Sequence, residues 1–163
     1  MKKIFLAAIL ISSLVMTPAL AISETQEKAI VDHCEEIKND LRNVQKLDAR
    51  TRVYLGGYYE TILTKFITPL NVRLVENNMS STGLIDNQDQ LVKKRMVFVN
   101  DYIMYQQGLE DLVGANCKTE PTKFYEKLIE VRAKRKIVNQ DVAKIRELIS
   151  EQVKLVKGLR EKL

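Results

Sequence analysis

The residues of this chain best suited to redox, metal or nucleophilic chemistry are few: one histidine, His33, and two cysteines, Cys34 and Cys117. A catalytic or metal-binding site brings several such groups together. The two cysteines lack the close C-x-x-C spacing of a zinc site, and His33 has no second histidine with which to hold a metal. The sequence also has no C-x-x-C-H motif for attaching haem. We therefore predict no catalytic residue, no metal and no cofactor, so that the protein is not an enzyme.

Five tyrosines form the other group with chemical potential: Tyr54, Tyr58, Tyr59, Tyr102 and Tyr105. On helices they would gather near the middle of a bundle. Buried tyrosine rings usually pack in a core while the hydroxyl group reaches a polar partner, and this is the interpretation that we favour. The alternative is an aromatic groove that binds a small ligand.

The N-terminal segment has the three parts of a secretory signal peptide. A Lys-Lys start is followed by an apolar stretch over residues 4–15 and by an Ala-Leu-Ala cleavage site that ends at Ala21. The apolar stretch is shorter than the ~20 residues that span a bilayer, although an uncleaved membrane anchor is the alternative. We predict that residues 1–21 are a cleaved signal peptide and that residues 22–163 form one helical bundle domain. The location would be periplasmic or extracellular, in a bacterium.

Cleavage would lower the formal net charge from +5 to +3, because the removed segment holds two lysines and no acidic residue. So small an excess is weak support for a polyanionic partner. The two basic runs, residues 93–95 and 132–136, point in different directions around a helix and make no one-sided patch. These observations argue against nucleic acid, while an anionic envelope polymer or a membrane surface stays an alternative partner.

Export makes a disulfide the simplest state of the two cysteines. The alternative is a pair of buried free thiols. We predict a bond between Cys34 and Cys117. In the chain-entropy account, closing a loop of this size stabilises a protein by roughly 4–5 kcal/mol.

The clearest structural pattern is an apolar seam in the last third of the chain. Its steps alternate four and three residues, which is the spacing of a helix packed against other helices. The seam consists of Phe124, Leu128, Val131, Arg135, Val138, Val142, Ile145, Ile149, Gln152, Val156, Leu159 and Leu163. The pattern predicts a long helix over residues 121–163, with Arg135 and Gln152 as its two polar exceptions.

Two further helices are predicted upstream. A period near 3.6 indicates one long first helix, from a capping box at Ser23 to about Val75. Within it, Gly56-Gly57 lowers helix stability and Pro69 should kink the backbone. A second, shorter helix would begin at Asp86 and end near Gly114.

Together these elements predict an all-α fold, an elongated up-down-up three-helix bundle with coiled-coil-like packing. The first and third helices would each be about 61 Å long and the middle one about 42 Å. A bond between Cys34 and Cys117 would start the first and third helices at the same end, so that they run parallel. A loop over residues 76–85 would span the difference in length.

Arg135 interrupts the apolar seam and needs a partner if it is buried. Aligning Cys34 with Pro121 places Asp48 level with Arg135, since each lies 14 residues further along its helix. We therefore predict a buried Asp48–Arg135 ion pair that sets helix register, with Asp101 as the competing partner. The alternative is that Arg135 extends along its stem to solvent.

A long amphipathic surface without catalytic groups is typical of a binding protein. We predict an exported, non-enzymatic protein-interaction or scaffold module whose partner is another envelope protein. Small size, export, helicity and basic charge also resemble periplasmic holdase chaperones, and this resemblance implies the binding of unfolded clients. A third possibility is a helical bundle that binds a small ligand.

Overall fold

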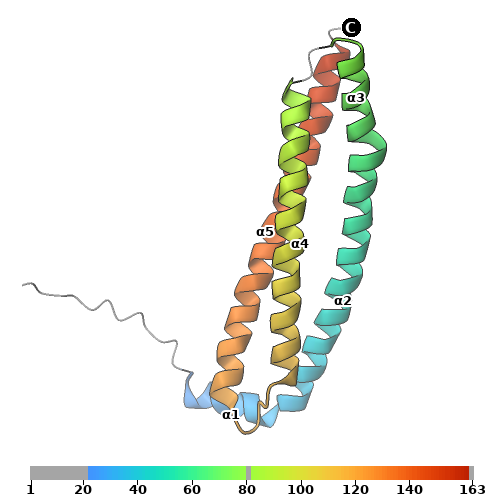
Figure 1. Cartoon of the computed structure of the whole chain (residues 1–163). Helices are drawn as coiled ribbons and strands as arrows, with labels where there is room; N and C mark the ends of the chain where they lie inside the picture. The colour runs from blue at the N-terminus through green and yellow to red at the C-terminus, as the bar shows by residue number, and fades with distance from the viewer. Residues whose placement is uncertain (1–21, 80–81, 162–163) are drawn as a thin grey trace, which may run out of the picture.

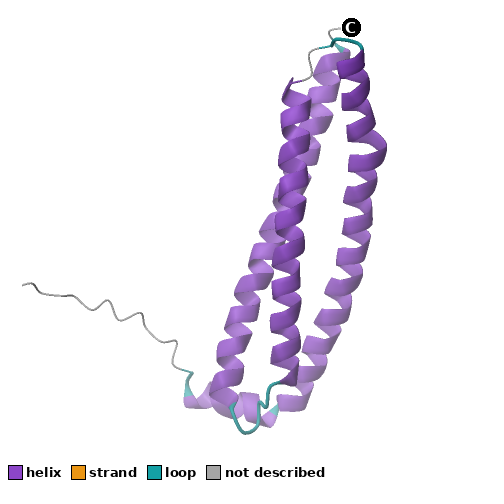
Figure 2. Ribbon diagram, in the orientation of Figure 1, coloured by secondary structure: helices purple, strands orange, loops and turns teal. Residues whose placement is uncertain are grey.

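The computed structural model describes residues 22–79 and 82–161, and every regular element within these ranges is helical (Figure 2). The elements are α1 (Glu24–Asp32), α2 (Cys34–Thr61), the π-helical segment η1 (Ile62–Ile67), α3 (Thr68–Glu76), α4 (Thr82–Gly114) and α5 (Pro121–Arg160). The prediction of an all-α fold is confirmed. The predicted signal peptide, residues 1–21, lies outside the described residues.

The helices form an elongated molecule (Figure 1). α2, η1 and α3 follow one another as a single rod, α4 runs back alongside it, and α5 runs in the direction of α2. α1 lies across the end from which α2 begins. The described residues therefore form four helical rods, whereas the sequence predicts three.

The additional rod arises from a break at His33, whose backbone leaves the helical region (φ −107°, ψ 20°). The predicted capping box at the start of α1 is present, with Ser23 and Gln26 each satisfying the other's backbone amide. α1 then places Ile30 in the common core and packs against α5. The prediction of one unbroken first helix is wrong because the apolar spacing continues across the break.

A π-helical turn takes the place of α-helix directly before Pro69. The proline ring cannot donate a hydrogen bond to the carbonyl of Lys65 and clashes with it in a regular α-helix. The backbone widens here, and the Thr68 amide donates to the Leu63 carbonyl five residues earlier. The distortion predicted at Pro69 is thus spread over a full turn.

Helix packing is uneven along the molecule. α4 and α5 make the most extensive contact of any two elements, while α2 approaches α4 at fewer places. The core is formed by buried apolar and aromatic side chains from all the rods: Ile30, Cys34, Tyr59, Leu63, Ile67, Leu91, Phe98, Tyr102, Tyr105, Leu109, Leu112, Cys117, Phe124, Val131, Val138, Ile145 and Leu148. The centre of the molecule is therefore the α4–α5 pair, with the α2–η1–α3 rod laid against it.

The predicted disulfide is confirmed. Cys34 and Cys117 are bonded, with their Cα atoms 5.6 Å apart, and both residues are buried. Cys34 begins α2 and Cys117 lies in the connection between α4 and α5. The bond therefore ties the more loosely packed rod to the α4–α5 pair at one end.

Candidate functional site

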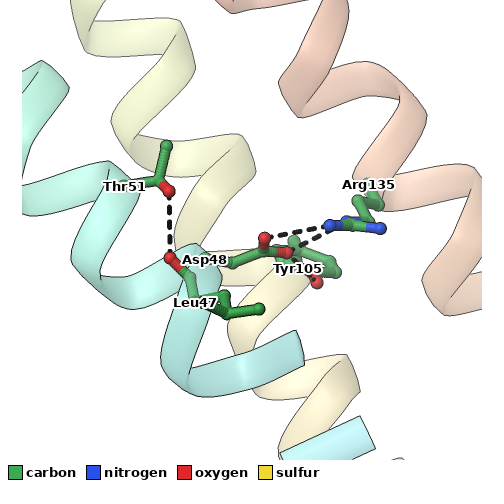
Figure 3. A network of polar contacts seen from close by, with 5 residues as sticks. All are labelled: Leu47, Asp48, Thr51, Tyr105 and Arg135. Carbon is green, nitrogen blue, oxygen red and sulfur yellow. Dashed lines mark hydrogen bonds and ion pairs between the residues drawn. The ribbon is translucent and has the colours of Figure 1, made fainter. Parts of the chain in front are cut away.

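The structure brings Asp48 and Arg135 together from α2 and α5 (Figure 3). The Arg135 Nε and Nη2 atoms donate to the two Asp48 carboxylate oxygens, each over 2.9 Å. Such two-pronged pairing is the strongest geometry for an arginine and a carboxylate. The Asp48 carboxylate raises the pKa of Arg135, so the guanidinium is charged.

A third residue joins the pair. The Tyr105 hydroxyl of α4 donates to Asp48 Oδ2 over 2.6 Å. Burial raises the pKa of Tyr105, and the hydrogen bond to Asp48 raises it further, so that the hydroxyl keeps its proton. One carboxylate thus links α2 to both α4 and α5 (Figure 3).

The Asp48–Arg135 ion pair is less buried than predicted. The Asp48 side chain is 20% exposed and the Arg135 side chain 47% exposed, so the pair lies at the edge of the core. The reason is that α2 makes little close backbone contact with α5, and the long arginine side chain bridges the space. Asp101, the proposed competitor, lies elsewhere, beside Asp141 and Lys94.

The buried charge of α5 is Asp141, only 2% exposed. Lys94 of α4 pairs with its Oδ1 atom, while its Oδ2 atom has no hydrogen-bond partner within the described part of the chain. Burial and the neighbouring Asp141 carboxylate together raise the pKa of Asp101. Asp141 is not among the residues singled out from the sequence, although it lies four residues before Ile145 and seven before Leu148, both buried on the same helix face.

His33 and the two basic runs, also singled out from the sequence, are each paired with carboxylates. His33 is exposed, and its Nδ1 atom lies 2.9 Å from Glu36 Oε2. Both basic runs are engaged in ion pairs, as shown by Arg95 with Glu60 and by Lys134 with Glu130. These pairs interrupt the positive charge of both runs with carboxylates.

The tyrosines do not form a single cluster. Tyr59, Tyr102 and Tyr105 are buried, whereas Tyr54 and Tyr58 are 73% and 48% exposed. Tyr102 packs edge-on against Tyr105 and carries the Arg52 guanidinium 5.1 Å from its ring centre. This arrangement is core packing with one cation–π contact at the rim.

An apolar stripe runs along one face of α4, and we call it the α4 stripe: the exposed Val92, Met96 and Ile103, and the half-buried Val99, which packs against the core. Its steps of four, three and four place these side chains on one helix face. Val92, Met96 and Ile103 are 38%, 55% and 45% exposed. Two hollows of about 290 and 320 Å³ separate α4 from α2 beside the stripe, and both are lined by Val53 of α2.

A larger hollow of about 540 Å³ lies between η1 and α5, and we call it the η1–α5 groove. Its walls are apolar side chains, including Ile62 and Phe66 on one side and Ile149 and Val153 on the other. Gln152 and Lys157 of α5 are its polar lining residues apart from the Tyr58 hydroxyl.

The described residues contain no group of three or more His, Cys, Asp or Glu side chains placed to hold a metal ion. Among the same residues, no helix is long and apolar enough to cross a membrane. Comparison with known proteins found no matching family model, no matching curated protein and no matching solved structure.

Proposed function

We propose that this protein is an exported, non-enzymatic interaction module that binds an amphipathic helix of another envelope protein along the α4 stripe. The N-terminal pattern of residues 1–21 and the Cys34–Cys117 bond support a location outside the cytoplasm. In this proposal the α4–α5 pair, packed in the manner of a coiled coil, is the rigid support. Cleavage of the leader leaves the helical domain free in that compartment.

The α4 stripe is the observation that carries the proposal. Single exposed apolar residues are ordinary, but here three of them, Val92, Met96 and Ile103, share one helix face with the half-buried Val99. Together, and beside the two hollows, they form a continuous apolar surface. The apolar side chains of the stripe recur at steps of three and four residues. An amphipathic helix has apolar side chains at the same steps, so its apolar face can pack along the stripe. Such a helix would lie in the depression between α2 and α4.

The test uses a photo-crosslinking amino acid at position 96 or 103 of the full chain, expressed in a strain that exports it. Matched controls carry the same group at Val97 and Met104, which are 44% and 49% exposed on another side of α4. We expect one partner to be crosslinked from positions 96 and 103 only. With that partner purified, Met96→Glu should weaken binding at least tenfold while Met104→Glu leaves it unchanged.

Two results would overturn the proposal. Crosslinking at equal levels from both sides of α4 would show that the stripe is not a specific surface. Crosslinks only between copies of this chain would show that the stripe closes a homo-oligomer.

A further inference from the structure

The η1–α5 groove owes its shape to the π-helical turn. Tyr58, Ile62, Phe66 and Leu70 follow one another at steps of four, which drift around a regular α-helix of 3.6 residues per turn. A π-helical turn holds more residues than an α-helical turn, because its hydrogen bonds run from residue i to i+5. The η1 segment therefore brings all four side chains onto the groove, and π-turns of this kind often occur at functional sites.

Large apolar side chains at the groove are left uncovered. Phe66 is 65% exposed and Val153 49% exposed, and they stand on opposite walls. Covering such surface is favourable by about 25 cal/mol for each Å² removed from water. The volume of about 540 Å³ lies within the range of small-molecule sites.

The polar lining of the groove combines one positive charge with a buried amide that lacks hydrogen-bond partners within the described residues. Among the described residues, Lys157 is the one charged residue that lines the groove, and no carboxylate accompanies it. Gln152 also lines it and is only 4% exposed, yet neither its amide nitrogen nor its carbonyl oxygen has a hydrogen-bond partner within the described residues. A buried amide without partners is costly, and a ligand able to bond it would remove that cost.

We propose that the η1–α5 groove binds a free fatty acid, with its acyl chain between η1 and α5 and its carboxylate near Gln152 and Lys157. Lys157 supplies the opposite charge, and the buried Gln152 side chain turns toward the groove on binding so that its amide nitrogen donates to the carboxylate. An uncharged apolar partner fits less well, because it would bring no opposite charge to Lys157 and would leave the Gln152 amide without a partner. This site is separate from the α4 stripe and does not depend on it.

Isothermal titration with dodecanoate, kept below its micelle concentration, tests the site on the exported chain. We expect one molecule bound per chain. Dodecyltrimethylammonium, which has the same chain length and a cationic head, should bind at least tenfold more weakly. This comparison needs no substitution, so it stands even if a variant fails to fold.

Three variants locate the site, and each has a control. Val153→Trp fills the groove and should abolish binding, while Val97→Trp, on a side of α4 away from the stripe, should not change it. Lys157→Glu and Gln152→Leu should each weaken dodecanoate binding at least fivefold, and Lys154→Glu, on the same helix outside the groove, should have less than a twofold effect. Helical circular dichroism and thermal unfolding verify that every variant is folded.

The proposal fails if the anionic and cationic amphiphiles bind equally, or if Val153→Trp binds dodecanoate as tightly as the unmodified chain. It also fails if Gln152→Leu raises stability without weakening dodecanoate. In that case the unpartnered amide is a packing defect. The close approach of Gly83 to Leu155 shows the register of α4 against α5, and this register puts Asn87 level with Gln152. Asn87 is also buried and unpartnered within the described residues, so in a purely structural explanation it is the alternative hydrogen-bond partner of Gln152.

Discussion

Asp48 is the residue at which three helices meet. Its carboxylate accepts hydrogen bonds from Tyr105 of α4 and Arg135 of α5, yet these two partners differ in exposure. The Tyr105 hydroxyl is buried, whereas Arg135 can exchange its bonds for water. The tyrosine contact should therefore matter more to stability, even though the ion pair is the contact that sequence reasoning singles out.

A double-mutant cycle on Asp48 tests this order. We expect Asp48→Ala to lower the free energy of unfolding by about 1–3 kcal/mol, because it leaves the Tyr105 hydroxyl without a partner. Arg135→Ala should cost less than about 1 kcal/mol. In urea unfolding, the Asp48–Tyr105 coupling, measured with Tyr105→Phe, should exceed the Asp48–Arg135 coupling. The reverse order would place the main contribution in the ion pair.

Asp101 makes stability depend on pH. Its folded-state pKa lies above the unfolded value, so the native fold favours the protonated carboxyl. That contribution is fully present below the unfolded pKa of about 3.9 and is lost as the pH rises through the folded pKa. At neutral pH the ionised Asp101 then opposes Asp141.

We therefore expect Asp101→Asn to stabilise the protein at pH 7, because the amide stays neutral and can donate to the Asp141 carboxylate. The gain over the unmodified chain should shrink toward pH 3.5. Urea unfolding at several pH values measures it, with Asp111→Asn on the same helix as the control. A gain that is the same at every pH would contradict this account.

At the scale of elements, α2 contains two glycines that lower its helix stability although no packing contact requires them. Gly56 and Gly57 lie inside the helix, and a Cβ atom on either would meet no atom within 4 Å. Glycine costs a helix interior about 1 kcal/mol relative to alanine. The pair therefore lowers the stability of this part of α2, although no neighbouring atom requires glycine at either position.

Replacing these glycines should stabilise the fold. Gly57→Ala is expected to raise the free energy of unfolding by about 0.5–1 kcal/mol, as measured by urea denaturation. Gly108→Ala on α4 is the contrasting control, since its Cβ would come within 3.3 Å of Val131 Cγ2. An equal gain at both positions would show that the close α4–α5 packing adjusts at no cost.

At the scale of the whole molecule, the disulfide compensates for the uneven packing. The α2–η1–α3 rod makes fewer contacts than α4 and α5 make with each other, and the Cys34–Cys117 bond joins it to that pair. The bond closes a loop with a sequence separation of 83 residues. A long loop is where a cross-link restricts the unfolded chain most.

Removing the bond should destabilise the protein more than the loss of Asp48 or Arg135 does. We expect the Cys34→Ala, Cys117→Ala double variant to lose about 4–5 kcal/mol of unfolding free energy, and reductant to weaken the unmodified chain similarly. Reductant should have no effect on the double variant. Equal urea midpoints for the oxidised and reduced protein would mean that packing alone holds the α2 rod in place.

Much of this architecture follows from local sequence rules. The capping box at Ser23, the start of α5 at Pro121 and the end of α4 at Gly114 all lie where the sequence predicts them. These features depend on residues a few positions apart, whose preferences act before any long-range contact forms. The pairing of Cys34 with Cys117 follows from the expectation of export together with a cysteine count of two.

Tertiary contacts determine which face of α5 is buried, and this could not be predicted from the sequence. The predicted seam of α5 included Arg135, but the structure buries Asp141 and Leu148 and leaves Arg135 at the rim. Sequence periodicity gives the direction in which each side chain points around its helix. Which of these directions becomes buried depends on which neighbouring helix packs most closely against it. Here α4 packs more extensively on α5 than α2 does, so the buried face turns toward α4. The break at His33 is likewise absent from the local pattern, because the apolar spacing continues across it through Ile30, Cys34 and Ile37.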